Sequence, residues 1–172
     1  MPKTELTGFP SGASYKQAGT YSCWAAAARA IINYYAKSEI CKSDQELVDA
    51  WNRKMGTKYD LSVSQSASAA LLDLGFKCPA DGSAIPTADE IEAEMGRGIP
   101  LLANVGTTPL PSKVKRDVKY KDGHWVVIVG INGSKTKIDV FDPADGNIKE
   151  VDYDAVTYQI GQYWENTSYV SK

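Results

Sequence analysis

The chain has 172 residues, of which 43% are hydrophobic and 23% are charged, and its formal net charge is −2. This length suits one full domain, and the balance of hydrophobic and charged residues is that of an ordinary soluble globular protein. Because the charge is slightly negative and no large basic stripe occurs, a nucleic acid is a poor candidate for a partner.

The first half of the chain predicts helices. Apolar residues recur at helical spacing after Cys23, which indicates a helix with one buried face. Ser43 with Glu46 has the pattern of a capping box at a helix start, and Thr87 with Glu90 repeats it. The four expected helices cover residues 23–36, 43–51, about 64–74 and 87–96, the third ending at Gly75.

After Pro100 the pattern changes to that of strands, with β-branched residues and alternation of apolar and polar positions. Helices followed by an antiparallel sheet predict an α+β fold, with a helical half over about 15–98 and a β half over about 99–170 of one domain. We expect the helix that begins at Cys23 to pack against this sheet. The strand candidates are residues 99–106, 124–132, 137–143, 147–153 and 161–170.

Between the first two strand candidates, residues 107–123 have the composition of an exposed loop. Its basic part, residues 113–121, is expected to be either a solvated segment or a flap that selects acidic residues or docks on an inhibitor. Among the tryptophans, we expect Trp24 and Trp164 in the core. Trp125 is expected to pack on the sheet or to shield His124 and Asp142.

The sequence contains no apolar run of the roughly 20 residues that a membrane-spanning helix needs. Residues 1–12 also lack the apolar core of a secretory signal. We therefore expect a monomer that does not insert into a membrane. It either stays in the cytoplasm of the cell that makes it, leaves by a secretion system that reads no such signal, or is cut from a larger chain.

The chain has an odd number of cysteines, and none of them form a C-x-x-C pair: they are Cys23, Cys41 and Cys78. This arrangement is weak for a zinc site and weak for a disulfide framework. A bond between Cys41 and Cys78 is left open by the sequence.

Cys23 stands at the expected start of a helix, where backbone N–H groups are unpaired and the helix dipole is positive. A thiol at such a position ionises more easily, and the thiolate is the reactive form. The position alone suits a core residue equally well, because free cysteines are among the most buried residues.

His124, the single histidine, opens one strand candidate, and Asp142 ends the next. If these strands pair as a hairpin, the two residues become neighbours at one edge of the sheet. A carboxylate there would fix the imidazole tautomer and stabilise its charged form. Each residue alone has an ordinary explanation, His124 as a surface side chain and Asp142 as a turn former before proline.

In combination, Cys23, His124 and Asp142 form a set of nucleophile, base and orienting carboxylate. Gln17 lies six residues before Cys23, in an expected loop, and its amide could donate a hydrogen bond to an oxyanion. Taken by itself, Gln17 would be a solvated loop residue.

This set resembles a papain-like cysteine peptidase. That family carries a Gln six residues before the catalytic Cys, an aromatic residue after it, then a His, then Asn or Asp. The resemblance covers residues 15–165 and implies that the Cys23 thiolate, paired with a His124 imidazolium, attacks a peptide carbonyl. It further implies that Asp142 orients His124, that Gln17 and the Cys23 backbone N–H hold the oxyanion, and that no metal or organic cofactor is needed.

Three departures from lysosomal enzymes point to compact bacterial relatives. The residues before Cys23 are Tyr21 and Ser22 with no first cysteine, the spacing from Cys23 to His124 is only about a hundred residues, and the third member is Asp. Similar enzymes include bacteriocin-processing peptidases and papain-like bacterial effector proteases. This likeness implies a specific protein target, cleavage after small residues such as Gly-Gly, and a toxin or effector domain with a cognate immunity or inhibitor protein over the cleft.

Two other functions stay open. A peptidoglycan amidase or a transglutaminase-like enzyme would use the same thiol, although Gln17 favours the peptidase because many wall hydrolases lack a Gln at this spacing. A non-catalytic binding module on a papain-like frame is the third possibility. The complete set of Cys23, His124 and Asp142 argues against it.

Overall fold

The computed structural model describes residues 2–78, 80–82, 86–105, 123–153 and 164–172. Within these residues the helical elements are a short 3-10 turn at Ala13–Tyr15, α1 (Cys23–Ala36), α2 (Asp44–Met55), α3 (Ala67–Asp73) and α4 (Ala88–Gly96). The strands are β1 (Thr4–Glu5), β2 (Ala80–Gly82), β3 (Leu101–Val105), β4 (His124–Ile131), β5 (Lys137–Asp142), β6 (Asn147–Asp152) and β7 (Trp164–Tyr169).

The strands described form one antiparallel sheet of seven, in the order β2-β7-β3-β4-β5-β6, with β1 paired to β4. Along one edge of β4, β3 pairs with residues 124–128 and β1 takes over at Gly130 and Ile131. The other edge of β4 pairs with β5. All eight residues of β4 are buried, so this strand is the centre of the sheet.

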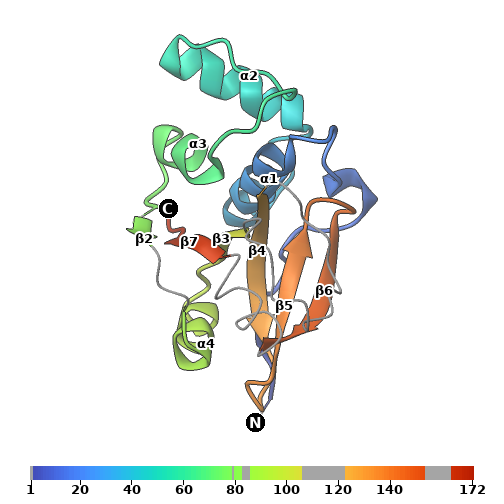
Figure 1. Ribbon diagram of the computed structural model, residues 1–172, viewed down its shortest axis with the longest axis vertical. Helices are drawn as coiled ribbons and strands as arrows, with labels where there is room; N and C mark the ends of the chain where they lie inside the picture. Colours follow the sequence, from blue (N-terminus) through green and yellow to red (C-terminus); the bar gives the residue numbers. More distant parts are fainter. Residues whose placement is uncertain (1, 79, 83–85, 106–122, 154–163) are drawn as a thin grey trace, which may run out of the picture.

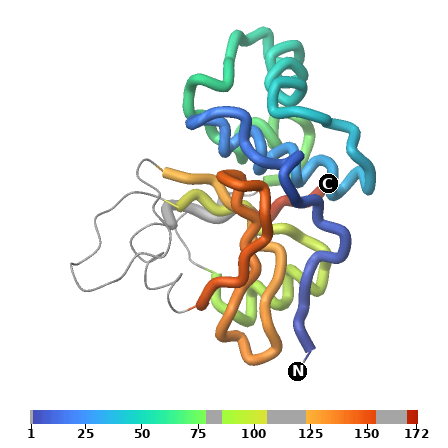
Figure 2. The backbone as a smooth tube through the Cα atoms, turned by 90° about the vertical axis from the view of Figure 1, so that its right-hand side faces the viewer, coloured from blue at the N-terminus to red at the C-terminus, as the bar shows by residue number. Residues whose placement is uncertain are grey.

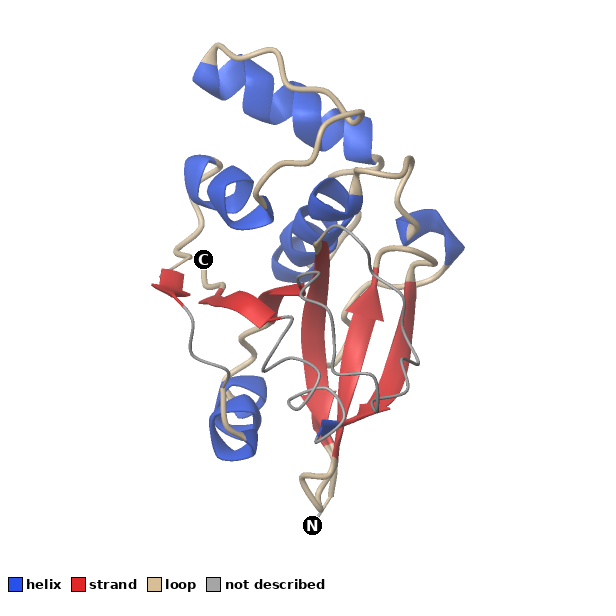
Figure 3. Ribbon diagram, in the orientation of Figure 1, coloured by secondary structure: helices blue, strands red, loops and turns tan. Residues whose placement is uncertain are grey.

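Most of the helices lie at one end of the molecule and most of the sheet at the other (Figure 1). Helices α1, α2 and α3 gather at one end, and α1 packs against β4. Helix α4 lies away from α2 and α3 and contacts β4 and β1, as the separate colouring of helices and strands in Figure 3 makes plain. The α+β class is therefore confirmed, and so is the packing of the Cys23 helix on the sheet.

Side-chain caps define where the helices begin. Thr87 Oγ1 accepts a hydrogen bond from Glu90 N while the Glu90 carboxylate accepts one from Thr87 N, so the expected capping box is confirmed. Ser43 likewise caps α2, but the Glu46 carboxylate accepts from the N–H of Lys42 instead of Ser43. Helix α3 starts at Ala67, three residues later than expected, because Ser66 and not Ser64 supplies its cap.

The five strand candidates of the second half are confirmed as β3, β4, β5, β6 and β7. Strands β1 and β2, of two and three residues, were not expected. The loop expected at 107–123, with its basic segment 113–121, lies outside the described residues except for Gly123, and the side chain of Trp164 is also outside them.

The core between α1 and the sheet is made of small residues on the helix and branched residues on the strands. Ala25, Ala27 and Ala28 are fully buried, which lets α1 approach β4 closely. Trp24 is fully buried, as expected, and packs edge-on against Trp51 with ring centroids 5.5 Å apart. The chain trace in Figure 2 shows the N-terminal segment running from the sheet up to the helical end, which brings residues 12–22 beside α1.

Candidate active site

Cys23 is the first residue of α1, directly after the N-cap residue Ser22. The Ser22 carbonyl accepts hydrogen bonds from the N–H groups of Ala25 and Ala26, which starts the helix. The N–H of Cys23 itself has no acceptor within the helix, because the first helical N–H groups never do. The start of α1 therefore supplies both the thiol and a backbone donor beside it.

His124 and Asp142 meet across the hairpin of β4 and β5. Val127 pairs with Phe141, so the register continues to Asp142 opposite Val126, on the same side of β4 as His124. His124 Nε2 lies 2.8 Å from Asp142 Oδ1. Both residues are buried. The neighbourhood expected from the hairpin is present in the structure.

The His124 imidazole lies close enough to the Cys23 sulfur to act on its ionisation. Because Nε2 faces Asp142, Nδ1 is the ring nitrogen left for the sulfur. Burial raises the pKa of the Cys23 thiol, but the His124 hydrogen bond and charge, with the N–H groups of Trp125 and Trp24, bring that pKa below its usual value.

The pKa of His124 moves the opposite way. Burial lowers it, but the hydrogen bonds to Asp142 and Cys23 and the charges of those two groups raise the pKa above its usual value overall. A lowered thiol pKa beside a raised imidazole pKa favours the thiolate–imidazolium pair. This arrangement can deliver a nucleophilic sulfur and a proton to the same small region.

Gln17 lies beside the turn that follows Asp142, where its backbone N–H donates to the Pro143 carbonyl at 2.8 Å, and its amide is turned back on its own loop. Its Nε2 donates hydrogen bonds to the carbonyl oxygens of Gly19 at 2.6 Å and Thr20 at 3.3 Å. Its Oε1 is buried and has no hydrogen-bond partner among the described residues. Because both amide hydrogens are used inside the loop, Nε2 must leave one of these carbonyls before it can reach an oxyanion.

Residues 13–172 match the model of the Peptidase_C39 like family. The chain belongs to this family. The match covers nearly the whole chain and supports a papain-like cysteine peptidase, in agreement with the α+β architecture. No curated protein matches the chain.

In this Peptidase_C39 like protein, the carboxylate of Asp142 has partners that the sequence did not suggest. Its Oδ1 also accepts a hydrogen bond from Ala144 N at 2.9 Å, and its Oδ2 lies 2.9 Å from Lys149 Nζ. Lys149 Nζ is also 2.8 Å from Asp145 Oδ2. The feature that could have identified Lys149 in the sequence is the short turn between β5 and β6. The register of this hairpin pairs Asp142 with Asn147, so Lys149, two residues further along β6, projects from the same face as Asp142.

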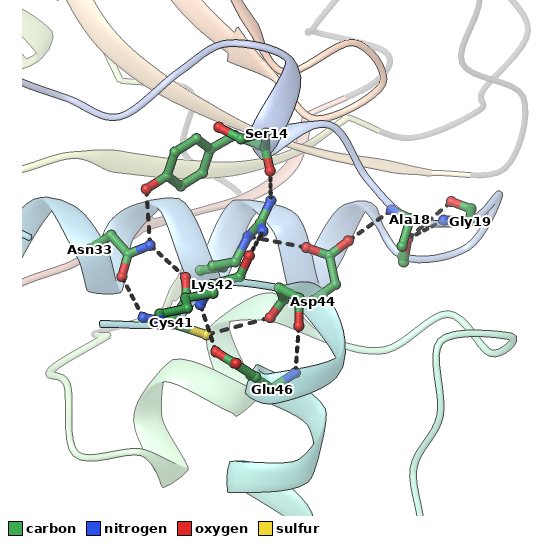
Figure 4. A network of polar contacts seen from close by, with 12 residues as sticks. Ser14, Ala18, Gly19, Asn33, Cys41, Lys42, Asp44 and Glu46 are labelled. Carbon is green, nitrogen blue, oxygen red and sulfur yellow. Dashed lines mark hydrogen bonds and ion pairs between the residues drawn. The ribbon is translucent and has the colours of Figure 1, made fainter. Parts of the chain in front are cut away.

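A buried ion pair ties the loop before Cys23 to the helices (Figure 4). Asp44 Oδ2 accepts a hydrogen bond from Ala18 N at 2.8 Å, and Asp44 Oδ1 lies 3.2 Å from Arg29 Nε. The Ser22 hydroxyl, which donates to the Gly19 carbonyl at 3.0 Å, also acts on this carboxylate and lowers its pKa. Burial raises the pKa of Asp44, and these partners offset only part of the increase.

Arg29 completes that cluster from the middle of α1. Its guanidinium donates to the carbonyls of Lys42 at 2.9 Å and Ser14 at 2.8 Å, and lies over the ring of Tyr15. The side chain is 3% exposed, so the charge is almost fully removed from water. The cluster therefore fixes the segment that carries Gln17 and Ser22 relative to the Cys23 helix.

Trp24 and Trp125, which follow Cys23 and His124 in the sequence, hold a second segment against the site. Trp24 Nε1 donates to the carbonyl of Val63 at 3.2 Å, and Trp125 Nε1 donates to the carbonyl of Gln65 at 3.1 Å. Trp125 is buried and, besides lying in β4, anchors the loop before α3. Val63 and Tyr21 are exposed apolar side chains on the segments next to Cys23.

The described part of the chain contains no group of His, Cys, Asp and Glu side chains that could hold a metal ion. No helix in that part is long and apolar enough to cross a membrane. All three cysteines are free thiols, so the bond between Cys41 and Cys78 that the sequence left open is not formed here.

Proposed function

We propose that this protein is a cysteine endopeptidase that uses Cys23 as nucleophile, His124 as acid and base, and Asp142 as the orienting carboxylate. The single observation that supports it best is that His124 joins the two other residues: its Nε2 lies 2.8 Å from Asp142 Oδ1, and its imidazole lowers the pKa of the Cys23 thiol. The family membership supports a cysteine peptidase in general.

In the proposed reaction the Cys23 thiolate attacks the carbonyl carbon of a peptide bond and forms a C–S bond, and the carbonyl oxygen becomes an oxyanion. The His124 imidazolium then gives its proton to the departing amine as the C–N bond breaks, which leaves an acyl-enzyme. Neutral His124 next removes a proton from water, the hydroxide attacks the thioester, and the C–S bond breaks. This releases the acid and restores the thiolate and imidazolium.

The oxyanion of each tetrahedral state would be held by the Cys23 backbone N–H and by Gln17 Nε2. One donor of this kind contributes about 3–4 kcal/mol in comparable sites. For Gln17 the contribution requires a rotation away from the carbonyl of Gly19 or Thr20, which it now binds.

The substrate class and the biological setting follow from resemblance and belong to the same proposal. A bacterial effector or toxin domain would cut one protein target, after small residues such as Gly-Gly. It would act in the producing cell or reach its target by a secretion system that reads no signal peptide. A cognate immunity or inhibitor protein would cover the cleft beside Cys23.

The proposal is tested by labelling new protein N-termini in cells that express the wild-type chain or Cys23→Ala. New cleavage sites are expected with the wild type and with the control Cys41→Ala, and none with Cys23→Ala. Identical N-termini in all three cultures would contradict the peptidase. Release of stem peptides from purified sacculi without any proteome cleavage would favour the amidase.

A further inference from the structure

We propose that Lys149 is a positioning residue of this site, which holds the Asp142 carboxylate and sets the pH range over which Cys23 and His124 remain an ion pair. The inference concerns a residue outside the expected triad. The inference rests on the proposed function only because it treats Cys23 and His124 as a functional ion pair. The effect of Lys149 on His124 is electrostatic and can be measured without a substrate.

The first observation is geometric. Lys149 Nζ lies 2.9 Å from Asp142 Oδ2, while the other oxygen of the same carboxylate faces His124 Nε2 at 2.8 Å. Lys149 Nζ is also 2.8 Å from Asp145 Oδ2. Five groups of alternating charge therefore follow one another from Cys23 through His124, Asp142 and Lys149 to Asp145.

The second observation is that the register of the β5–β6 hairpin fixes the face on which Lys149 projects. Gly146 N donates to the carbonyl of Asp142 at 2.8 Å, and Asn147 N donates to Asp145 Oδ1 at 3.0 Å. These bonds close the turn, and the pairing of Asp142 with Asn147 sets the register. The strand pairing thus places Lys149 on the same face of the hairpin as Asp142, and its side chain, which is 40% exposed, reaches the carboxylate from there.

The third observation is the environment of the carboxylate. The side chain of Asp142 is 4% exposed, so water screens its charge poorly and its neighbours matter. Among the described residues, the charged groups that interact with His124 or Asp142 are Cys23 from α1, Lys149 from β6 and Asp145 from the turn. Burial lowers the pKa of Lys149, but Asp145 and Asp142 raise it above its usual value overall, so Lys149 is charged throughout the neutral range.

The sign of the effect follows from these charges. Asp142 stabilises the protonated imidazole, and the positive charge of Lys149 on the far side of the same carboxylate opposes that stabilisation. Removing the Lys149 charge should therefore raise the pH at which His124 loses its proton. Removing the Asp145 charge leaves Lys149 less compensated and should lower that pH.

The experiment is an NMR titration of the imidazole C–H signal, which is unique because the chain has one histidine. The variants are Lys149→Gln, Lys149→Arg and Asp145→Asn. The matched control is Lys137→Gln, which removes another lysine of the same hairpin that pairs with Glu150 at 2.9 Å. We expect the midpoint to rise by about half a pH unit in Lys149→Gln, to fall in Asp145→Asn, and to stay near the wild-type value in Lys149→Arg and Lys137→Gln.

A midpoint unchanged in Lys149→Gln, or moved in the same direction by Lys149→Gln and Asp145→Asn, would overturn the proposal. A loss of packing would not shift the midpoint in opposite directions for the two variants. If Lys149→Gln does not fold, Lys149→Met, which keeps a long side chain and removes the same charge, takes its place beside Lys149→Arg and Asp145→Asn. The titration does not depend on peptidase activity. The proposed function would fail separately, if the wild type and Cys23→Ala gave the same protein N-termini.

Discussion

The three thiols of this chain have nearly the same exposure but different chemistry. Cys23, Cys41 and Cys78 are 5%, 9% and 8% exposed, so access alone does not distinguish them. Burial raises the pKa of Cys41 and of Cys78 to about 11, whereas His124 and two N–H groups bring the pKa of Cys23 below its usual value despite burial. The reactive thiolate should therefore be concentrated at one residue.

We expect iodoacetamide at about pH 6 to alkylate Cys23 at least about 100-fold faster than either other thiol, because only ionised sulfur reacts. Peptide mass mapping of each labelled cysteine over time measures this ratio. In His124→Asn, which removes the charge and keeps a polar side chain, the advantage of Cys23 should largely disappear. Equal and slow labelling of all three thiols in the wild type would favour a non-catalytic binding module.

At the scale of residues, the sequence predicted which side chains of the candidate site lie together, but not how each of them is oriented. The order of Cys23, His124 and Asp142 along the chain, with the expected hairpin, was enough to place these residues together. The turned-back amide of Gln17 could not be predicted, because a loop side chain chooses among nearby carbonyls that only the folded loop positions. Lys149 was missed because its contact depends on the register of a turn.

At the scale of elements, the turn between β5 and β6 is joined to the loop that carries Gln17. Gln17 N donates to the Pro143 carbonyl at 2.8 Å, and Gly12 N donates to the Gly146 carbonyl at 2.6 Å. The turn that follows Asp142 therefore also supports the loop before Cys23. One glycine makes this approach possible.

Gly146 has a φ of +78°, and a Cβ there would lie against the Gly12 carbonyl oxygen and within 2.7 Å of Lys16 N. We expect Gly146→Ala to lower the free energy of unfolding by about 2–4 kcal/mol, since the left-handed backbone and the backbone contact both oppose a side chain. Urea denaturation measures the loss. The control is Gly96→Ala, where a Cβ meets open space and where no loss is expected. Equal stability of the two variants would mean that the two loops do not depend on this contact.

The long elements were predictable and the short ones were not. Helical spacing predicted the start of α1 at Cys23, the capping box predicted the start of α4 to within one residue, and alternation with β-branched residues predicted β4 and β5. Strands β1 and β2 are too short to show a period. Their places are set by unpaired edges of the larger sheet, which is a tertiary effect.

At the scale of the whole molecule, segments that are distant in the sequence are held together around α1 by a buried cluster. Arg29 alone joins the segments around Ser14, Lys42 and Asp44. The order of the halves could be predicted from the sequence. The buried ion pair could not, because its partners share no local pattern, and Arg29 in an alanine-rich helix gave no sign of burial.

Burial of Cys41 and Cys78 should make the whole fold sensitive to alkali. The pKa of each thiol is near 9.0 in the unfolded chain and about 11 in the folded protein. As the pH rises between these values, the unfolded state loses its thiol protons first. The free energy of unfolding therefore falls over this pH range. Two pKa units correspond to about 2–3 kcal/mol for each thiol. Urea unfolding under reducing conditions at pH 8, 9, 10 and 11 measures the decline. In the double variant Cys41→Ala with Cys78→Ala the decline should be smaller by about 4–6 kcal/mol, twice the contribution of one thiol, because the other titrating groups are the same in both proteins. Parallel curves for the two proteins would show that these thiols ionise as readily folded as unfolded.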